Sequence, residues 1–197
     1  MKKLTFRYGA MNASKSAQAI MTAYNYKENG KRPLIIVPDI MLTKDGRHLK
    51  SRIGIEAECI PSSEILRPDT VCHTAEYDAV IVDEAQFLTT EEADLLTDIT
   101  DDMDIPVICY GLKTDFTGKL FEGSKRLLEL ADDIEEIPTI CWCGRKARFN
   151  ARVVDGKVVS EGEQVKLGGN ESYRALCREH YFKKMLAPDN INEEGNE

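Results

Sequence analysis

Four short apolar runs constrain the fold of this chain more than any other feature. They are KLTFRYGA from residue 3, PLIIVP from residue 33, YDAVIVDEAQF from residue 77 and IPVICYGL from residue 105. The first leads into a turn. The others are continuous apolar stretches, which are typical of strands covered on both faces of a parallel sheet. We therefore predict an α/β domain with a mainly parallel sheet and helices on both faces.

Three further segments read as helices. SAQAIMTAYNYKENG has apolar residues near the 3.6-residue period and closes at Gly30. TTEEADLLTDITD follows the third apolar run, and we predict Thr90 as its N-cap with carboxylates in its first turn. GSKRLLELADDIEEI, which spans 123–137, is predicted as a third helix. Strands and helices thus alternate over residues 1–137.

The character of the chain changes after residue 137. Residues 138–185 hold cysteines, paired glycines and short β-like runs such as RFNARVV and KVVSEGEQVKL, and residues 186–197 are polar and acidic. A chain of 197 residues can bury one core and a small appendage. We predict an α/β nucleotide-binding domain over 1–137, a small second domain over 138–185 and a disordered tail over 186–197.

Composition limits the partners of the protein. No apolar run approaches the roughly 18 residues of a membrane span, and the N-terminus lacks the apolar region of a secretory signal. A net charge of −8 disfavours a general nucleic-acid binder, which needs a basic face. We expect a cytoplasmic protein with small-molecule partners, without a membrane or nucleic-acid partner.

The stretch YGAMNASKSAQ, residues 8–18, resembles a phosphate-binding loop. The pattern GxxxxGK[ST] fits except that Ser14 stands where a glycine is usual. In such a loop backbone N–H groups surround the anion, the lysine reaches the β and γ phosphates, and the hydroxyl holds magnesium. An ordinary strand-to-helix turn with a capping serine is an equal alternative on this match alone. The candidate phosphate-binding residues are Gly9, Met11, Asn12, Ala13, Ser14, Lys15 and Ser16.

A second acidic motif favours the nucleotide site. VIVDEAQF is an apolar strand that ends in Asp83 and Glu84. In nucleotide hydrolases and kinases one carboxylate at such a position orients the magnesium shell, and a neighbour can act as a base. A solvated acidic turn is the alternative. Because successive side chains of an extended segment point in opposite directions, we predict different tasks for the two carboxylates.

Cysteines and a histidine form two close-spaced pairs. CWCG at 141–144 and CREH at 177–180 could supply four tetrahedral ligands to zinc, with no open position for catalysis. Unpaired buried thiols are the alternative, and the first pair has only one intervening residue. The predicted zinc ligands are Cys141, Cys143, Cys177 and His180. The other cysteines, Cys59, Cys72 and Cys109, are interpreted as apolar fillers.

These motifs together resemble the type II, zinc-containing thymidine kinases over residues 3–184. The resemblance is carried by GAMNASKS, SRIG at 51–54, VDEAQF, YGLKTDF at 110–116 and GGNESYRALCREHYFKK at 168–184. It implies a P-loop NTPase-like domain with a small zinc-containing lasso domain. It also implies transfer of the γ-phosphoryl group of ATP to the 5′-hydroxyl of thymidine.

The resemblance also implies residue roles. Lys15 and Ser16 serve phosphate and Mg²⁺, Asp83 supports the metal shell, and Glu84 is the catalytic base. The segment between the cysteine pairs matches a loop that closes over the nucleoside, with a structural zinc at its roots. A homotetramer with feedback inhibition by thymidine triphosphate is implied as well. The implied nucleoside contacts are Met11, Phe87, Leu112, Phe116, Gly168 and Tyr173.

Two single substitutions depart from the family pattern. Ser14 adds a Cβ close to the phosphates and penalises positive φ. The loop could still form if this residue has ordinary helical dihedrals, and we interpret it as a functional variant. Asn150 replaces the threonine that is usual near the base site.

A third departure affects a whole element. The Asp-Thr-Arg or Asp-Thr-Lys element of the family stands here as Leu42, Thr43 and Lys44. Lys44 could keep the cationic role, and Asp39 or Asp45 could supply the missing carboxylate.

Two other functions compete with the kinase. One is a P-loop ATPase that acts on nucleic acid and grips it with a zinc module, against which the acidic balance counts. The other is a catalytically weak nucleotide-binding regulator, which Ser14 and Leu42 favour.

Overall fold

The computed structural model describes residues 2–42, 47–164 and 172–187. The chain forms two compact units. The first comprises 1–9, 14–113 and 120–137, and the second comprises 10–13, 114–119 and 138–197. Segments 10–13 and 114–119 thus belong with the C-terminal part of the chain, a grouping that the sequence did not suggest.

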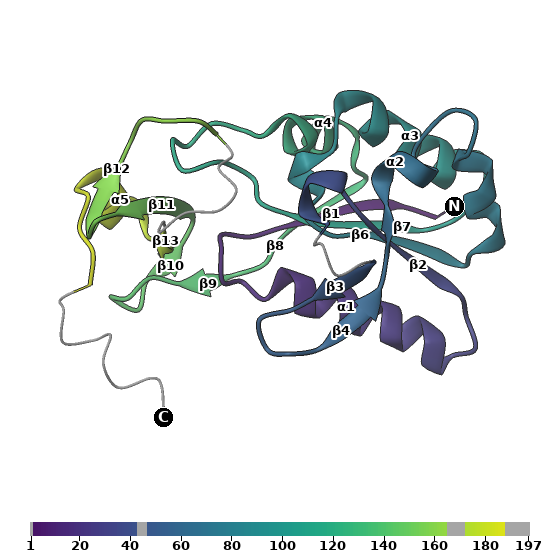
Figure 1. Ribbon diagram of the computed structural model, residues 1–197, viewed down its shortest axis with the longest axis horizontal. Coiled ribbons are helices and arrows are strands. Elements are labelled where there is room, and N and C mark those ends of the chain that lie inside the picture. The colour runs from purple at the N-terminus through teal and green to yellow at the C-terminus, as the bar shows by residue number, and fades with distance from the viewer. Residues whose placement is uncertain (1, 43–46, 165–171, 188–197) are drawn as a thin grey trace. The chain divides into compact units, whose positions relative to one another are not determined.

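The first unit is built on a six-stranded sheet in the order β5-β2-β6-β7-β1-β8 (Figure 1). Every neighbouring pair in this sheet runs parallel. The predicted parallel sheet is therefore confirmed. The strands are β1 (Leu4–Tyr8), β2 (Pro33–Val37), β5 (Ile60–Pro61), β6 (Ala79–Val82), β7 (Val107–Gly111) and β8 (Asp133–Glu136).

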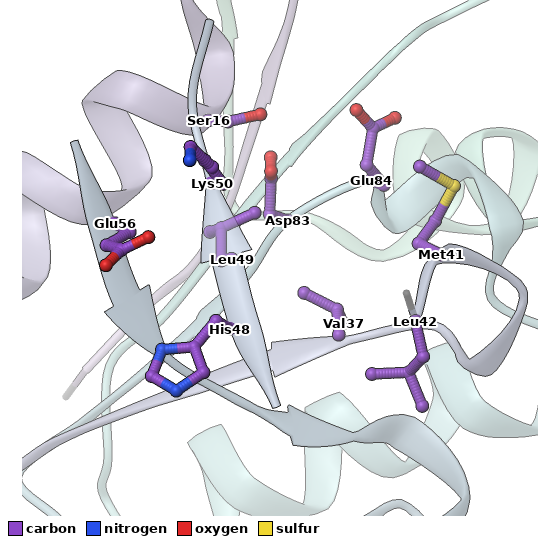
Figure 2. Close-up of a pocket in the computed structure, with 10 residues that line it drawn as sticks. All are labelled: Ser16, Val37, Met41, Leu42, His48, Leu49, Lys50, Glu56, Asp83 and Glu84. Atoms are coloured by element: carbon purple, nitrogen blue, oxygen red, sulfur yellow. The ribbon is translucent and has the colours of Figure 1, made fainter. Parts of the chain in front are cut away.

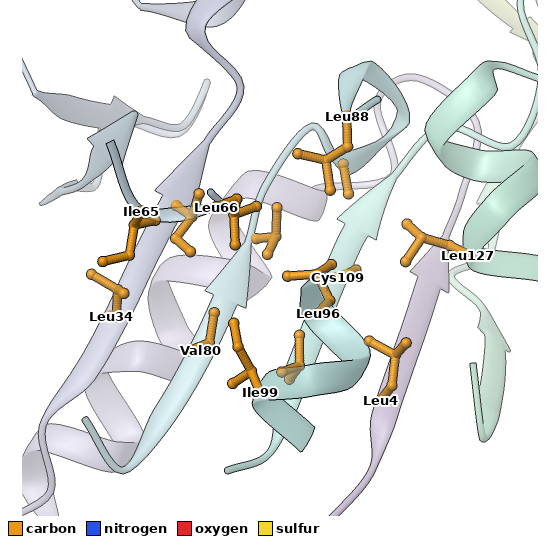
Figure 3. Packing of buried hydrophobic residues seen from close by; sticks show 14 of the residues in the cluster. Leu4, Leu34, Ile65, Leu66, Val80, Leu88, Leu96, Ile99, Cys109 and Leu127 are labelled. Atoms are coloured by element: carbon orange, nitrogen blue, oxygen red, sulfur yellow. The ribbon is translucent and has the colours of Figure 1, made fainter. Parts of the chain in front are cut away.

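Helices cover both faces of this sheet. Successive side chains of a strand point to opposite faces, so alternate residues of β2 belong to different apolar clusters. Leu34 and Ile36 belong to one cluster, and Ile35 and Val37 belong to the other. Helix α1 (Lys15–Glu28) contributes alanines to the cluster of Ile35. Helices α3 (Thr90–Asp101) and α4 (Glu122–Leu130) contribute leucines and an isoleucine to the cluster of Leu34 (Figure 3). The predicted helices on both faces are thus confirmed.

The N-cap of α3 is Thr89 and not the predicted Thr90. The Thr89 side chain accepts a hydrogen bond from the backbone N–H of Glu92 (3.1 Å), and the Glu92 carboxylate accepts one from the N–H of Thr89 (2.9 Å). This reciprocal capping box needs a glutamate three residues after the cap, and only the earlier threonine has one.

The predicted helix over 123–137 is wrong in its second half. α4 ends at Leu130, and 133–136 forms the edge strand β8, which pairs with β1. The Asp132 carboxylate accepts a hydrogen bond from the backbone N–H of Leu4, and Lys3 and Arg7 form ion pairs with β8. An acidic strand is suited to a sheet edge, where charge opposes pairing with other chains.

The remaining elements of the first unit are short. Strands β3 (His48–Lys50) and β4 (Glu56–Glu58) form an antiparallel hairpin. The others are η1 (Asp39–Met41), α2 (Ser62–Ile65), η2 (Val71–Glu76) and η3 (Ala85–Phe87). η3 follows β6 directly and carries the residues after Glu84.

The second unit contains two small antiparallel sheets and a short helix. Of the predicted run KVVSEGEQVKL, only Lys157–Val159 forms a strand, and 165–167 lie outside the described residues. The unit has its own core, which includes Cys141 and Leu176. Its elements are β9 (Thr139–Ile140), β10 (Lys146–Ala147), β11 (Phe149–Val154), β12 (Lys157–Val159), β13 (Ser172–Leu176) and α5 (Arg178–Phe182).

Within the described parts of the chain, every helix is too short or too polar to cross a membrane. The predicted disordered tail falls almost entirely outside these parts, which end at residue 187.

Candidate functional site

The predicted phosphate loop connects β1 to the start of α1, and two of its residues have left-handed backbone. Asn12 has φ 65°, and Ser14 has φ 56° and ψ 29°. Ser14 therefore does not have the helical dihedrals that we gave as the condition for tolerating a serine in this loop. A non-glycine residue in this region costs roughly 1–2 kcal/mol. Such strain is typical of functional loops, where the surrounding structure over-determines it.

Lys15 is the first residue of α1, and only 7% of its surface is exposed. Burial lowers the pKa of Lys15, while the carboxylates of Glu84 and Asp83 act in the opposite direction. A cation and two carboxylates therefore share this region of the first unit. Ser16 follows Lys15 on the helix, as the phosphate-loop pattern requires.

Asp83 follows the last residue of β6 and is fully buried. Neither carboxylate oxygen has a hydrogen-bond partner within the described part of the chain. Burial, and secondarily the charge of Glu84, raises the pKa of Asp83 to about 7, although the nearby Ser16 hydroxyl lowers it in part. A buried carboxylate with no partner requires an explanation, and a bound cation is one that fits a carboxylate beside a serine hydroxyl.

Glu84 differs from Asp83 in backbone and in exposure. It has left-handed backbone (φ 52°, ψ 34°) and is half-buried. The strand ends at Val82, so the extended segment from which we inferred opposite side-chain directions does not reach Glu84. Burial and local backbone, rather than strand alternation, distinguish the two carboxylates.

Asp83 and Glu84 line a cavity of about 490 Å³ within the first unit (Figure 2). The hairpin β3–β4 forms one side of it, and the start of α1 contributes Ser16. The wall thus combines carboxylates, a hydroxyl and a cationic side chain from separate elements. The lining residues are Ser16, Val37, Met41, Leu42, His48, Leu49, Lys50, Glu56, Asp83 and Glu84.

Of the residues discussed for the missing carboxylate, the structure describes only Asp39. Its carboxylate accepts hydrogen bonds from the Ser63 N–H (3.0 Å), the Ser63 hydroxyl (2.6 Å) and the Ser62 hydroxyl (3.1 Å). Asp39 therefore binds the first residues of α2 instead of standing free for a ligand. Thr43, Lys44 and Asp45 lie outside the described residues.

The implied nucleoside contacts fall in both units. Phe87 in η3 packs edge-on against Phe121, with ring centroids 5.5 Å apart. Leu112 follows β7, and its backbone N–H donates a hydrogen bond to the side chain of Gln86 (2.9 Å). Met11, Phe116 and Tyr173 belong to the second unit, and Gly168 lies outside the described residues.

Two buried polar residues organise the second-unit contacts. The Asn150 side chain accepts a hydrogen bond from the backbone N–H of Met11 (2.7 Å) and donates one to the carbonyl of Thr114 (3.1 Å). The Arg152 guanidinium lies over the Phe116 ring, 3.8 Å from its centroid, and donates to the Tyr173 hydroxyl (2.9 Å). The segment from β11 thus positions three implied nucleoside contacts.

The two cysteine pairs meet in the second unit. Cys141 and Cys143 lie in the turn of the β9–β10 hairpin, where Gly144 supplies the left-handed position (φ 82°). Cys177 is the N-cap of α5, and His180 lies within that helix. The ligand atoms of these four residues all lie within 4.8 Å of one another. The cluster could hold a metal ion.

The surroundings of this cluster favour tetrahedral metal binding. Cys141 Sγ lies 3.4 Å from His180 Nδ1, and Cys143 Sγ lies 4.0 Å from Cys177 Sγ. A backbone hydrogen bond from Arg145 lowers the pKa of Cys143 to about 7, toward the thiolate that a metal requires. The Trp142 ring stacks on His180 at 4.3 Å and orients it.

The remaining cysteines follow the prediction in two cases of three. Cys59 and Cys109 are buried fillers, whereas Cys72 is exposed, so its interpretation as a filler is wrong. Cys72 lies in η2, whose buried residues are Val71 and Thr74.

Sequence reasoning gave no role to Gln86 or Arg152. Gln86 lies inside the quoted motif VDEAQF, but its contacts with Glu84 and Leu112 depend on the fold. Arg152 stands in a run whose β-character was visible, yet nothing in the sequence indicates a buried guanidinium between two aromatic side chains.

Comparison with known proteins agrees with these features. The family described as thymidine kinase matches residues 2–181. Proteins named thymidine kinase from Legionella pneumophila (strain Paris), Lactococcus lactis subsp. lactis and Enterococcus faecalis are 48%, 44% and 43% identical to this chain. The alignments cover 92%, 94% and 98% of this chain and 90%, 100% and 100% of the relatives.

One solved structure, described as a DNA replication initiation factor, is 15% identical with a TM-score of 0.43. The match covers 70% of this chain and 40% of the solved chain. This similarity is too low to bear on function. The family match and the relatives do decide the question of membership: the chain belongs to the thymidine kinase family.

Proposed function

We propose that this protein is a thymidine kinase that transfers the γ-phosphoryl group of ATP to the 5′-hydroxyl of thymidine. The observation that carries the proposal is the grouping of a buried lysine with two carboxylates at the end of β6. Lys15 and Asp83 are both buried, and each influences the pKa of the other. Membership of the thymidine kinase family supports the choice of substrates.

Phosphoryl transfer depends mainly on positioning and on stabilisation of charge. Lys15 is proposed to face the β and γ phosphates, where its cation offsets the charge of the transferring group. Ser16 and Asp83 are proposed to hold Mg²⁺, which when bound supplies further neutralisation of the phosphates. The partnerless carboxylate of Asp83 supports this assignment.

Glu84 is proposed as the base that accepts the proton of the 5′-hydroxyl. It is half-buried at the wall of the cavity, whereas Asp83 is fully buried. A general base must come within hydrogen-bond reach of the hydroxyl, and exposure to the cavity makes this possible for Glu84. The phosphates themselves are proposed to contact the loop residues Gly9, Met11, Asn12, Ala13 and Ser14.

The remaining assignments extend the family resemblance. The proposed nucleoside contacts are Met11, Phe87, Leu112, Phe116, Gly168 and Tyr173. Zn²⁺ is proposed as the resident metal of Cys141, Cys143, Cys177 and His180, because three thiolates and an imidazole are a structural zinc set. A cytoplasmic homotetramer that thymidine triphosphate inhibits is also proposed on the family resemblance.

A thymidine-dependent ATP consumption assay tests the proposal. The expected result is stoichiometric formation of ADP and thymidine monophosphate that requires Mg²⁺. ATP turnover stimulated by DNA and not by thymidine would instead indicate an ATPase that acts on nucleic acid. Binding of thymidine triphosphate without any turnover would indicate a regulator, in which the strained Ser14 has compromised the loop.

A further inference from the structure

The buried side-chain amide of Gln86 connects Glu84 to the backbone after β7. Its Nε2 donates a hydrogen bond to Glu84 Oε2 (2.5 Å), and its Oε1 accepts one from the backbone N–H of Leu112 (2.9 Å). Only 1% of Gln86 is exposed. We infer that Gln86 is a positioning residue, which holds the Glu84 carboxylate ready for the substrate hydroxyl and ties it to Leu112. This inference rests on the proposed function.

The chemistry of its partners determines the orientation of the amide. The backbone N–H of Leu112 can only donate, so it must face the carbonyl oxygen of Gln86. The NH₂ group then faces Glu84, and an ionised carboxylate can only accept. Both contacts are therefore satisfied in one orientation of the amide and lost in the reverse one. In this orientation the amide N–H group holds Glu84 Oε2 in place.

Two glycines leave room for this arrangement. A Cβ added at Gly111 would lie 2.8 Å from Gln86 Oε1 and 3.1 Å from the backbone nitrogen of Gln86. A Cβ added at Gly123 would lie 2.5 Å from the Ala85 carbonyl oxygen. The η3 segment thus packs against backbone on two sides, where real Cβ atoms would not fit. This packing holds the backbone of Glu84, which precedes η3, in its left-handed conformation.

The segment that Gln86 reaches is held from its other side as well. The Ser124 hydroxyl donates a hydrogen bond to the Leu112 carbonyl (2.5 Å), and Ser124 is fully buried. Leu112 is a proposed nucleoside contact. The Gln86 side chain therefore connects Glu84, the proposed catalytic base, to a residue beside the substrate. A glutamate has several rotatable bonds, and fixing them in advance lowers the entropy that is lost in reaching the reactive geometry. The second oxygen, Oε1, is assigned to the substrate hydroxyl.

Several charged groups share the surroundings of Glu84 and must stay the same when variants are compared. Asp83 precedes it, and Lys15 lies at the start of α1. His48, Lys50 and Glu56 of the β3–β4 hairpin line the same cavity. Because all of these remain in every Gln86 variant, differences in kcat report the change at position 86.

The decisive variant is Gln86→Glu. It keeps the size of the side chain and an acceptor for the Leu112 N–H, but it places a carboxylate where an amide donated to Glu84. We expect kcat at neutral pH to fall roughly 10-fold or more, with less than about a threefold change in KM for thymidine. A loss of kcat with KM almost unchanged is the result expected for a displaced base, because the acceptor for the Leu112 N–H is kept.

Two further variants separate positioning from folding. Gln86→Met fills the same space without either hydrogen bond, so kcat should fall by a similar factor. Ser124→Ala removes the other hydrogen bond to Leu112 and leaves Glu84 untouched. It should lower the melting temperature and change kcat by less than about threefold. Gln86→Glu would show the same result if Gln86 had only a structural role.

The inference is overturned if Gln86→Glu folds and retains wild-type kcat. Nuclear magnetic resonance of the wild-type protein gives a second test that does not depend on folding of a Gln86 variant. The side-chain amide resonances of Gln86 should shift in Glu84→Ala but not in Glu91→Ala, and unshifted resonances in Glu84→Ala would refute the contact. Absence of thymidine-dependent turnover in the wild-type protein would instead refute the proposed function.

Discussion

The phosphate region (Ser14–Ser16 with Asp83 and Glu84) and the metal cluster (Cys141, Cys143, Cys177 and His180) are both assembled from two segments far apart in the sequence. The two sites differ in their backbone strain and in the arrangement of their polar groups. In the phosphate region two non-glycine residues have left-handed backbone, and a buried carboxylate lacks a partner. In the metal cluster the left-handed position is a glycine, and all four ligand atoms already face one another.

This difference indicates different relations to a ligand. Backbone strain and a buried charge without a partner are retained in a fold where they serve the binding of a ligand that is exchanged. A site with compatible backbone and converging soft ligands is suited to an ion that stays. We therefore expect changes in the phosphate region to affect turnover more than folding, and changes in the metal cluster to do the reverse. The predictions below test that contrast, from the largest effect to the smallest.

Removal of the metal should have the largest effect. Structural zinc contributes on the order of 10 kcal/mol in small modules. A strong chelator should therefore abolish amide protection over 138–187, while the sheet of the first unit keeps most of its protection in hydrogen exchange. Cys177→Ser should behave like the chelator, and Cys72→Ser, which changes an exposed thiol, should not. Protein purified without chelator that contains no zinc would contradict this expectation.

Lys15→Ala should have the opposite profile. It removes the cation proposed to face the transferring phosphate, and turnover should fall by about 10³-fold or more. Zinc content and hydrogen-exchange protection of the second unit should not change. Lys27→Ala is a matched control, because Lys27 is an exposed lysine of the same helix. If Lys15→Ala kept normal turnover, YGAMNASKSAQ would be only a structural turn.

Much of this contrast could be read from the sequence. Continuous apolar runs indicated the parallel strands, because such strands are buried on both faces. The acidic β8 was not recognised, since its strand character depends on pairing with β1 and not on an apolar face. The four metal-cluster residues could be identified from spacing alone, and the structure brings them together.

The sequence was less informative about backbone and side-chain environment in the phosphate region. The sequence suggested that Ser14 would be tolerated with helical dihedrals, whereas its backbone is left-handed. The burial of Asp83 and the role of Gln86 depend on tertiary packing around β6 and β7, which no local pattern encodes. Asp39 similarly was a candidate for the missing carboxylate. Its carboxylate instead accepts hydrogen bonds from the hydroxyls of Ser62 and Ser63.

Asp83 should make the stability of the protein dependent on pH. Its pKa rises from 3.8 to about 7 on folding, so between these values the unfolded chain has lost a proton that the folded protein retains. Stability should therefore decrease as pH rises from about 4 to 7, by up to about 4 kcal/mol from this group. Asp83→Asn should lack this decrease, which urea unfolding without Mg²⁺ at several pH values can measure. Parallel stability curves for wild type and variant would refute it.

Glu84→Gln should separate the two carboxylates. It keeps size and hydrogen bonding but cannot accept a proton, so kcat should fall roughly 10²-fold with thymidine still bound. Asp83→Asn should instead raise the Mg²⁺ concentration needed for half-maximal rate. Glu91→Gln, on an exposed residue of α3, is the control. Equal, small effects of both changes on kcat would reject the assignment, and normal turnover in Glu84→Gln would exclude its catalytic role.

Ser14→Gly should have the smallest effect, and it tests whether strain in the phosphate region is needed. Relief of the left-handed serine is worth roughly 1–2 kcal/mol, but glycine gains about 0.5–1 kcal/mol of entropy in the unfolded chain. The Ser14 side chain makes no capping hydrogen bond that the variant would lose. Stability should therefore rise by about 1 kcal/mol or less, with turnover kept or raised. Asn12→Gly is the matched control with a smaller expected gain, because asparagine tolerates this conformation better than serine. A less stable Ser14→Gly would show that the serine contributes a contact which outweighs its backbone strain.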